Sequence, residues 1–95
     1  MNDGLELQLT ERLLESCREC ERFNYFPNKF RQMMLENGSV ATMKSLLKGP
    51  PQDGFLRLLE ENRLDLSGEA IILEPQFQVL FTAGELQIAR DRLGR

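Results

Sequence analysis

Helix-breaking residues recur along this chain and divide it into short segments. Pro27, Gly38, the Gly49-Pro50-Pro51 run and Pro75 are the main breaks, because glycine readily ends helices and proline cannot continue one. Between these breaks, apolar residues recur every three or four positions, which is the spacing of a helix with one buried face. The sequence therefore predicts an all-α fold, a compact bundle of five or six short helices in a single domain.

The first segment has an apolar stripe with helical spacing. Thr10 precedes this stripe and suits the N-cap position, so we expect a helix over roughly residues 10–24. Residues 1–9 are expected to be an irregular N-terminal lead, and residues 10–95 to make up the single helical domain.

Further start and stop signals follow along the chain. The second helix should begin at about Pro27 or Asn28 and end at Asn37-Gly38, after which Ser39 can cap a third helix. Asp53 should cap a short fourth helix over residues 54–61. The first two thirds of the chain are thus expected to be helices with short connections.

The Arg63-Leu64-Asp65-Leu66-Ser67 stretch joins the two helical halves. Its leucines alternate with charged residues, so we expect an extended passage with the leucines inward and the charges paired locally or capping helix ends. Ser67 and Glu69 are start signals for another helix. The apolar residues 70–73 fit a helix or a strand by periodicity, and we expect a helix because no second strand is available to pair with it.

Two helical elements should complete the chain. The first is a turn around Phe77, and the second is a helix of about residues 83–93 that begins at a capping box formed by Thr82 and Glu85 and exposes Arg92. The core of the bundle is expected to consist of Phe23, Phe30, Met34, Leu46, Phe55, Leu58, Leu66, Ile72, Phe77, Leu86 and Ala89.

Charge is distributed unevenly along the chain. The net charge is -3, but residues 22–57 contain six basic and two acidic residues. Basic side chains near Tyr25 and Phe26 can hold phosphates while the rings stack on bases, although lysine and arginine stems also commonly cover apolar neighbours on a solvated surface. The candidate binding patch consists of Arg22, Lys29, Arg31, Lys44, Lys48 and Arg57.

Cys17 and Cys20 have the spacing of redox and metal-binding pairs. A redox pair needs an exposed helix N-terminus, whereas this pair is predicted to lie mid-helix on the apolar stripe. Two thiols also supply only half of a four-ligand zinc site, and the chain has no histidine. We therefore expect two core thiols and no cofactor, with a half-site completed by a second chain as the alternative.

Motifs for catalysis are missing from the sequence. It has no glycine-rich phosphate loop, no Ser-His-Asp set and no calcium-loop series. Neighbouring acids such as Glu60 and Glu61 face different directions on a helix and cannot frame one substrate. We predict that the protein is not an enzyme.

The N-terminal residues and the apolar runs of the sequence indicate the cellular location. No apolar run approaches the length needed to span a bilayer, and the first four residues lack the basic-then-apolar layout of a signal peptide. A cytoplasmic location without membrane binding is expected.

Two longer motifs stand out in the second half of the chain. They are Arg63-Leu64-Asp65-Leu66-Ser67-Gly68-Glu69 and Leu80-Phe81-Thr82-Ala83-Gly84-Glu85. With these motifs, of the forms Arg-Leu-Asp-Leu-Ser/Thr-x-Glu and Leu-Phe-Thr-x-x-Glu, the chain resembles a small, uncharacterised prokaryotic all-helical domain family. The resemblance spans about residues 25–93 and implies a short single-domain protein or a module of larger chains, with no catalytic residues and no established function.

These observations favour a non-enzymatic protein-interaction module. Its partner would be another protein or a second copy of the chain, bound through an apolar patch bordered by charge. The alternative is a nucleic-acid-associated helical domain that binds through residues 22–57.

Overall fold

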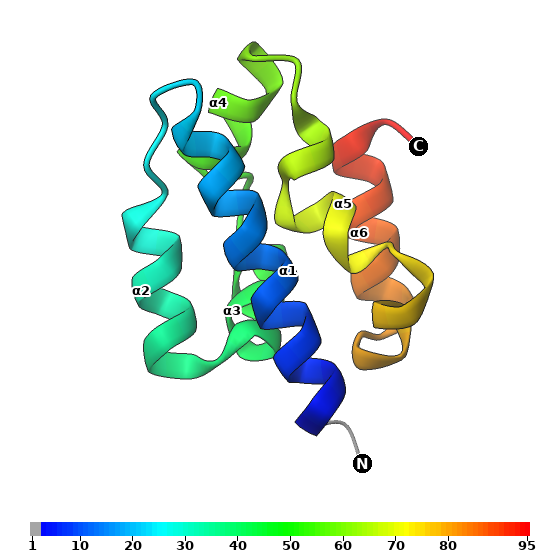
Figure 1. Ribbon diagram of the computed structural model, residues 1–95. Coiled ribbons are helices and arrows are strands. Elements are labelled where there is room, and N and C mark those ends of the chain that lie inside the picture. The colour runs from blue at the N-terminus through cyan, green and yellow to red at the C-terminus, as the bar shows by residue number, and fades with distance from the viewer. Residues whose placement is uncertain (1–2) are drawn as a thin grey trace.

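The longest element is the helix α1 (Asp3–Glu21), which crosses the molecule diagonally in Figure 1. The structure, a computed structural model, describes residues 3–95. Helix α2 (Asn28–Asn37) lies on one side of α1, α3 (Ser39–Lys48) lies behind it, and α4 (Asp53–Glu60) covers one end.

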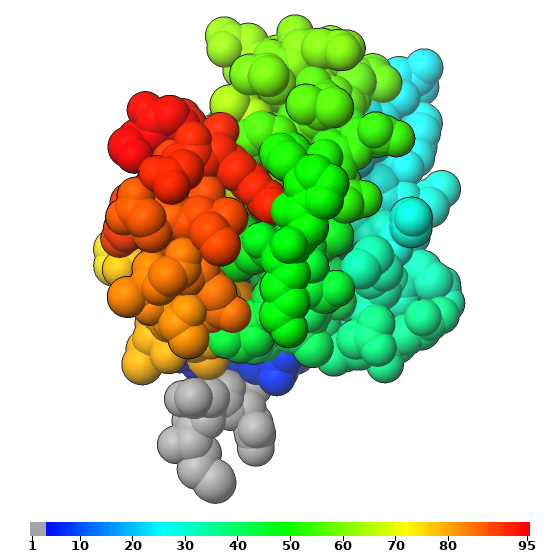
Figure 2. All heavy atoms as spheres, turned by 180° about the vertical axis from the view of Figure 1, so that it is seen from behind, coloured from blue at the N-terminus to red at the C-terminus, as the bar shows by residue number. Residues whose placement is uncertain are grey.

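The second half of the chain packs on the other side of α1. It consists of the 3₁₀ helix η1 (Leu64–Leu66), α5 (Gly68–Ile72), the 3₁₀ helix η2 (Pro75–Leu80) and α6 (Ala83–Leu93). From behind, α3 lies between α2 and α6 (Figure 2). Residues 3–95 therefore form a single compact domain that is 77% helical and has no strand, which confirms the predicted fold class.

The expected irregular lead is wrong for residues 3–9, and residues 1–2 lie outside the described part of the chain. Helix α1 already begins at Asp3, because Leu5 and Leu9 extend its apolar stripe and Leu9 is fully buried. The Thr10 hydroxyl does not cap this helix. It donates to the Glu6 carbonyl one turn earlier, at 3.0 Å.

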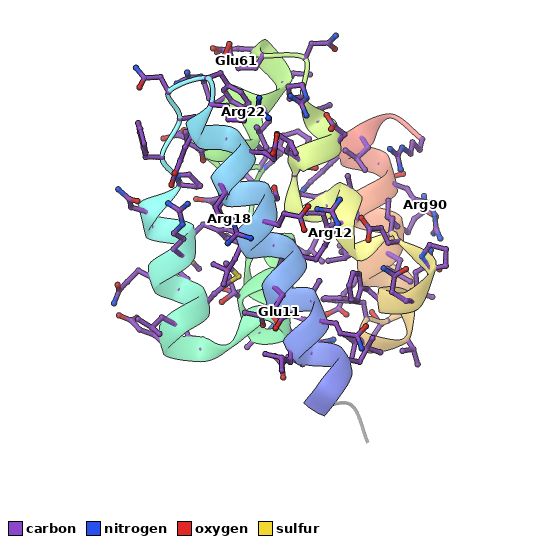
Figure 3. The ribbon with its side chains drawn as sticks, in the orientation of Figure 1. Glu11, Arg12, Arg18, Arg22, Glu61 and Arg90 are labelled. Atoms are coloured by element: carbon purple, nitrogen blue, oxygen red, sulfur yellow. The ribbon has the colours of Figure 1, made fainter. Side chains whose placement is uncertain are left out.

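The outer face of α1 carries charged side chains, as its amphipathic pattern predicts. Glu11, Arg18 and Arg22 are labelled along it in Figure 3. Arg12 points toward the second half of the chain and forms an ion pair with Glu74, with 3.0 Å between Nη2 and Oε2. This contact ties α1 to the segment between α5 and η2.

Ser39 does not cap α3, contrary to the prediction. Gly38 occupies the N-cap position with a φ of 87°, and the buried Ser39 is the first helical residue. The cap comes from α1, since the Glu6 carboxylate accepts a hydrogen bond from the Val40 N–H at 3.0 Å. A side chain 34 residues away therefore replaces the local cap.

Two further boundary predictions need correction. Asp53 is the first residue of α4 rather than its cap, and Gln52 holds the N-cap position without a side-chain hydrogen bond. The stretch at residues 63–67 is not extended, because Leu64–Leu66 forms η1. Its inward leucines are nevertheless confirmed, since Leu66 is buried and Leu64 packs against the same cluster.

The two caps predicted in the C-terminal half are confirmed. Ser67 caps α5 by accepting from the Ala70 N–H at 3.1 Å, which makes 70–72 helical. Thr82 and Glu85 form the predicted capping box at the start of α6. Both caps depend on hydrogen bonds between residues only three positions apart, so the local sequence is enough to predict them.

The core forms two clusters. The larger is built by α1, α2, α3, α5, η2 and α6 around Leu9, Leu13 and Met43, and the smaller consists of Cys20, Leu58 and Leu66. Eight of the eleven predicted core residues are buried. The other three, Phe23, Phe30 and Leu46, are only half-buried.

No helix among the described residues is both long and apolar enough to cross a membrane.

Candidate binding cleft

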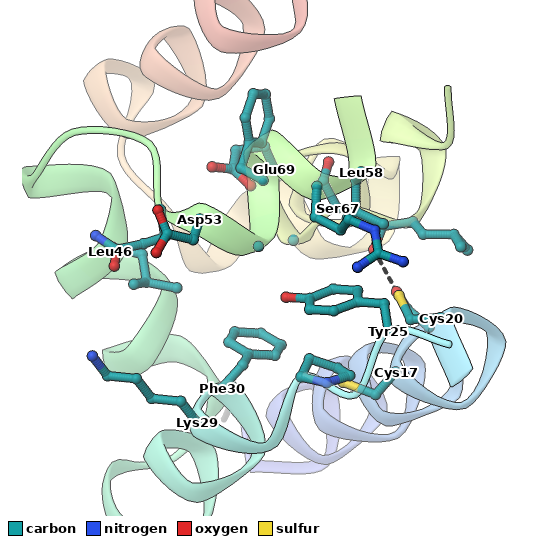
Figure 4. Close-up of a pocket in the computed structure, with 18 of the residues that line it drawn as sticks. Cys17, Cys20, Tyr25, Lys29, Phe30, Leu46, Asp53, Leu58, Ser67 and Glu69 are labelled. Atoms are coloured by element: carbon teal, nitrogen blue, oxygen red, sulfur yellow. Dashed lines mark hydrogen bonds between the residues drawn. The ribbon is translucent and has the colours of Figure 1, made fainter. Parts of the chain in front are cut away.

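A cleft of 480 Å³ lies between the C-terminal half of α1, α2 and α3 on one side and α4 and α5 on the other (Figure 4). Tyr25 and Phe30 project into it from the α1–α2 side, and Leu58 and Ser67 lie on the opposite side. Small-molecule and cofactor sites have volumes of roughly 300–1,000 Å³. The cleft leaves Phe30 and Leu46 half-buried, which explains why these two predicted core residues are not enclosed.

Tyr25 is placed by the turn that follows α1. Asn24 adopts a left-handed conformation with a φ of 68°, and the Tyr25 N–H donates to the Cys20 carbonyl at 3.1 Å. Proline at position 27 then begins the path into α2. The Tyr25-Phe26-Pro27 run therefore turns two aromatic rings toward the cleft, with Phe26 54% exposed at its rim.

Gly54 allows Tyr25 to lie against the first turn of α4. A Cβ atom at this position would overlap with the tyrosine hydroxyl oxygen. The guanidinium of Arg57 lies 5.6 Å from the centre of the Tyr25 ring and also donates to the Phe23 carbonyl at 3.1 Å. Burial raises the pKa of the Tyr25 hydroxyl, so the ring is neutral at physiological pH.

Cys17 and Cys20 line the cleft with their predicted inward orientation, and both are buried. Burial raises the pKa of Cys17 from 9.0 to about 11 and also raises the pKa of Cys20. The neutral thiol is neither a good nucleophile nor a metal ligand. Within residues 3–95, no group of three or more histidine, cysteine, aspartate or glutamate residues could hold a metal ion.

A buried ion pair closes one side of the cleft. Glu69 of α5 and Arg92 of α6 lie 3.0 Å apart, and their side chains are only 9% and 10% exposed. Arg92 also donates to the carbonyl oxygens of Leu46 and Gly49, at the C-terminal end of α3. The prediction that Arg92 is exposed is therefore wrong, because its side chain reaches back across α3.

The hydroxyl groups of Ser16 and Ser67, which line the cleft, are also engaged. The Ser16 hydroxyl donates to the Leu66 carbonyl, and the Ser67 hydroxyl donates to the Leu64 carbonyl at 2.7 Å while capping α5. The more accessible apolar lining consists of Tyr25, Phe26, Phe30, Met33 and Leu46, whereas Cys17, Cys20 and Met43 are at most 2% exposed.

The six predicted basic residues do not form one patch around this cleft. Only Lys29 and Arg57 line it. Four of the six are paired with acids: Arg22 with Glu19, Arg31 with Glu21, Lys44 with Glu85 and Arg57 with Glu61. Among the described residues, Lys29 and Lys48 alone of the six make no ion pair. The candidate patch was chosen by charge and did not include the aromatic and sulfur-containing residues that line the cleft. The Tyr25-Phe26-Pro27 run in the sequence indicated the aromatic part of this lining.

No protein-family model, no curated protein and no solved structure matches the chain.

Proposed function

We propose that this chain is a non-enzymatic protein-interaction module that docks apolar side chains of a partner protein into the cleft between α2 and α4. The cleft itself carries the proposal, since 480 Å³ of largely apolar space opens beside the exposed ring of Phe26. Buried, well-shaped pockets that accept apolar or aromatic anchors are typical centres of protein interfaces. The cytoplasmic location expected from the sequence remains part of this proposal.

The chemistry of the lining also favours docking over catalysis. The two thiols are neutral, and the buried acid Glu69 is already paired with Arg92. A methionine side chain is soft and adaptable, which suits a surface that receives side chains of another protein. Met33 is half-buried and lines the cleft, so it can play this part.

Nucleic-acid binding through residues 22–57 is the second candidate. It is favoured by Lys29 and Lys48, which are exposed and make no ion pair within residues 3–95. Phosphate binding weakens steeply with salt through counterion release, whereas apolar docking does not. Salt dependence therefore separates the two candidates.

The experiment is light scattering of the purified chain at low and high salt, with and without a random-sequence DNA duplex. A monomer that ignores the duplex agrees with docking onto a different protein. A dimer that persists in high salt would make a second copy the occupant, and a mass increase with the duplex at low salt only would favour the nucleic-acid candidate.

A further inference from the structure

The cleft restricts the backbone of whatever enters it. The hydroxyls of Ser16 and Ser67 are engaged with the Leu66 and Leu64 carbonyls, which leaves the Tyr25 hydroxyl, Lys29 and Asp53 as lining side chains without a hydrogen bond to another described residue. Residues 3–95 also contain no strand whose edge could pair with an added strand. An extended segment would therefore bury most of its backbone N–H and C=O groups without partners, which is costly. A helix satisfies these groups internally and presents only side chains.

The size of the cleft fits a small number of anchors. A cavity of about 150 Å³ lined by apolar side chains holds one benzene ring, so a cleft of 480 Å³ has room for about three groups of that size. A helix offers three anchors on one face at positions i, i+3 or i+4, and i+7. The helical walls of α2, α3 and α4 form the groove in which such a helix would lie.

Two charged residues flank the apolar lining. Lys29 in the first turn of α2 and Asp53 in the first turn of α4 are exposed and lie at the same end of the cleft, across from each other, in Figure 4. Neither forms an ion pair or a side-chain hydrogen bond with another described residue. They offer one positive and one negative contact at the edge of an otherwise apolar site.

We infer that the docked element is a short amphipathic helix of the partner, with three apolar anchors in the cleft, an acidic residue beside Lys29 and a basic residue beside Asp53. This inference rests on the proposed function, and it adds the conformation and the charge pattern of the partner segment. Charges at the rim contribute mainly to orientation and partner choice, and the apolar anchors contribute most of the affinity.

The test is a selection of random peptides of about 16 residues, long enough for anchors at i, i+4 and i+7, displayed and enriched on the full chain. Each enriched peptide is then titrated against the variants Met33→Trp and Leu35→Trp. Met33 lines the cleft without joining a core cluster, whereas Leu35 is 82% exposed on the same helix and lies outside the cleft. Phe26→Asp, at an exposed position, is a second cleft variant if Met33→Trp fails to fold.

We expect the enriched peptides to carry apolar residues at helical spacing and to become helical on binding, as measured by circular dichroism. Met33→Trp should lower the affinity of these peptides by about tenfold or more, as expected for the loss of one anchor. Leu35→Trp should leave the affinity unchanged. Lys29→Glu should weaken binding by about two- to fivefold, the range for an exposed ion pair, and a peptide with its acid changed to lysine should recover it.

Two failures can be told apart. If no enriched peptide responds to Met33→Trp or Phe26→Asp, the cleft is not a protein-docking site and the proposed function is wrong. If instead the affinity of the peptides falls with these variants, but the peptides bind in an extended form, lack helical spacing or bind Lys29→Glu as well as the original chain, the docking function is retained. In that case the inference of a helical, charge-matched partner segment is wrong.

Discussion

Arg92 of α6 and Glu69 of α5 form a buried ion pair, with 3.0 Å between Nη1 and Oε2. Because Arg92 also donates to the Leu46 carbonyl at 3.2 Å, one guanidinium joins α6, the start of α5 and the end of α3. The pair thus supports the wall of the cleft as well as the packing of the C-terminal helices.

Removing one member of this pair should destabilise the protein strongly. Glu69→Gln or Arg92→Met leaves a buried charge without its partner, so we expect a loss of about 3–5 kcal/mol in the free energy of unfolding, measured with urea. The control is Arg22→Met, which removes an exposed pair with Glu19 and should cost about 0–1 kcal/mol. Equal losses in both variants would contradict the structural role of the buried pair.

Gly54→Ala should destabilise the protein even though alanine is the better helix former. The added methyl group overlaps with the Tyr25 hydroxyl, and overpacking of this kind costs about 1–3 kcal/mol. Tyr25→Phe in the same chain should recover part of the loss by removing the overlapping atom. Gly49→Ala is the matched control because a Cβ there has no neighbour within 4 Å. Thermal unfolding of the four chains decides the outcome.

Glu85 should make stability depend on acidic pH. Desolvation raises its pKa, but hydrogen bonds from Lys44 and Thr82 outweigh this effect and leave the pKa lowered. Its contribution is therefore fully present above the ordinary glutamate pKa of about 4.3 and is lost as the pH falls through the lowered value. Glu85→Gln, which can still complete the capping box, should flatten this part of a urea-unfolding series against pH.

Thr82→Ala should weaken the start of α6 by about 1 kcal/mol, because the Glu85 N–H loses the acceptor that lies 3.1 Å away. Thr82→Ser keeps an oxygen at this position and should retain most of the stability. Chemical denaturation of the two variants gives the comparison, and an equal loss in both would mean that the hydroxyl group does not provide the cap.

Cys17 and Cys20 should react slowly with iodoacetamide in the folded protein. Each is 2% exposed, and burial raises the pKa of Cys17 to about 11, so little thiolate is present at neutral pH. Stability should fall as the pH rises above 9.0, since the unfolded chain releases the thiol proton first. Mass spectrometry of alkylation with and without urea measures the protection, and rapid labelling of the folded chain would exclude a core role.

The helical elements were predictable where the signal lies within one turn. The Ser67 cap, the capping box at Thr82 and the end of α2 at Asn37 all depend on neighbouring residues. Prediction failed where a distant group supplies the partner. Glu6 caps α3 from α1 and displaces Ser39 from that role, and no local pattern around residue 39 contains this information.

Some features of the cleft could likewise be predicted from neighbouring residues, and others depend on residues far apart in the chain. Its aromatic residues stand out in the Tyr25-Phe26-Pro27 run, but the space beside them exists because α4 packs at a distance from α2 and α3 (Figure 4). The basic residues were grouped by sequence position, whereas their acidic partners come from other turns and helices, such as Glu85 for Lys44. Basic residues that lie close together in the sequence therefore do not form one shared surface patch.

The fold class, most helix boundaries and the inward orientation of Cys17 and Cys20 could be predicted from the order of the residues alone. Apolar periodicity and capping residues act over three or four positions, so these signals can be recognised in the sequence. The burial of Arg92 against Glu69 and the cleft between α2 and α4 could not be predicted in this way. These features arise from packing between helices far apart in the chain, where the shape of each contact depends on all the others.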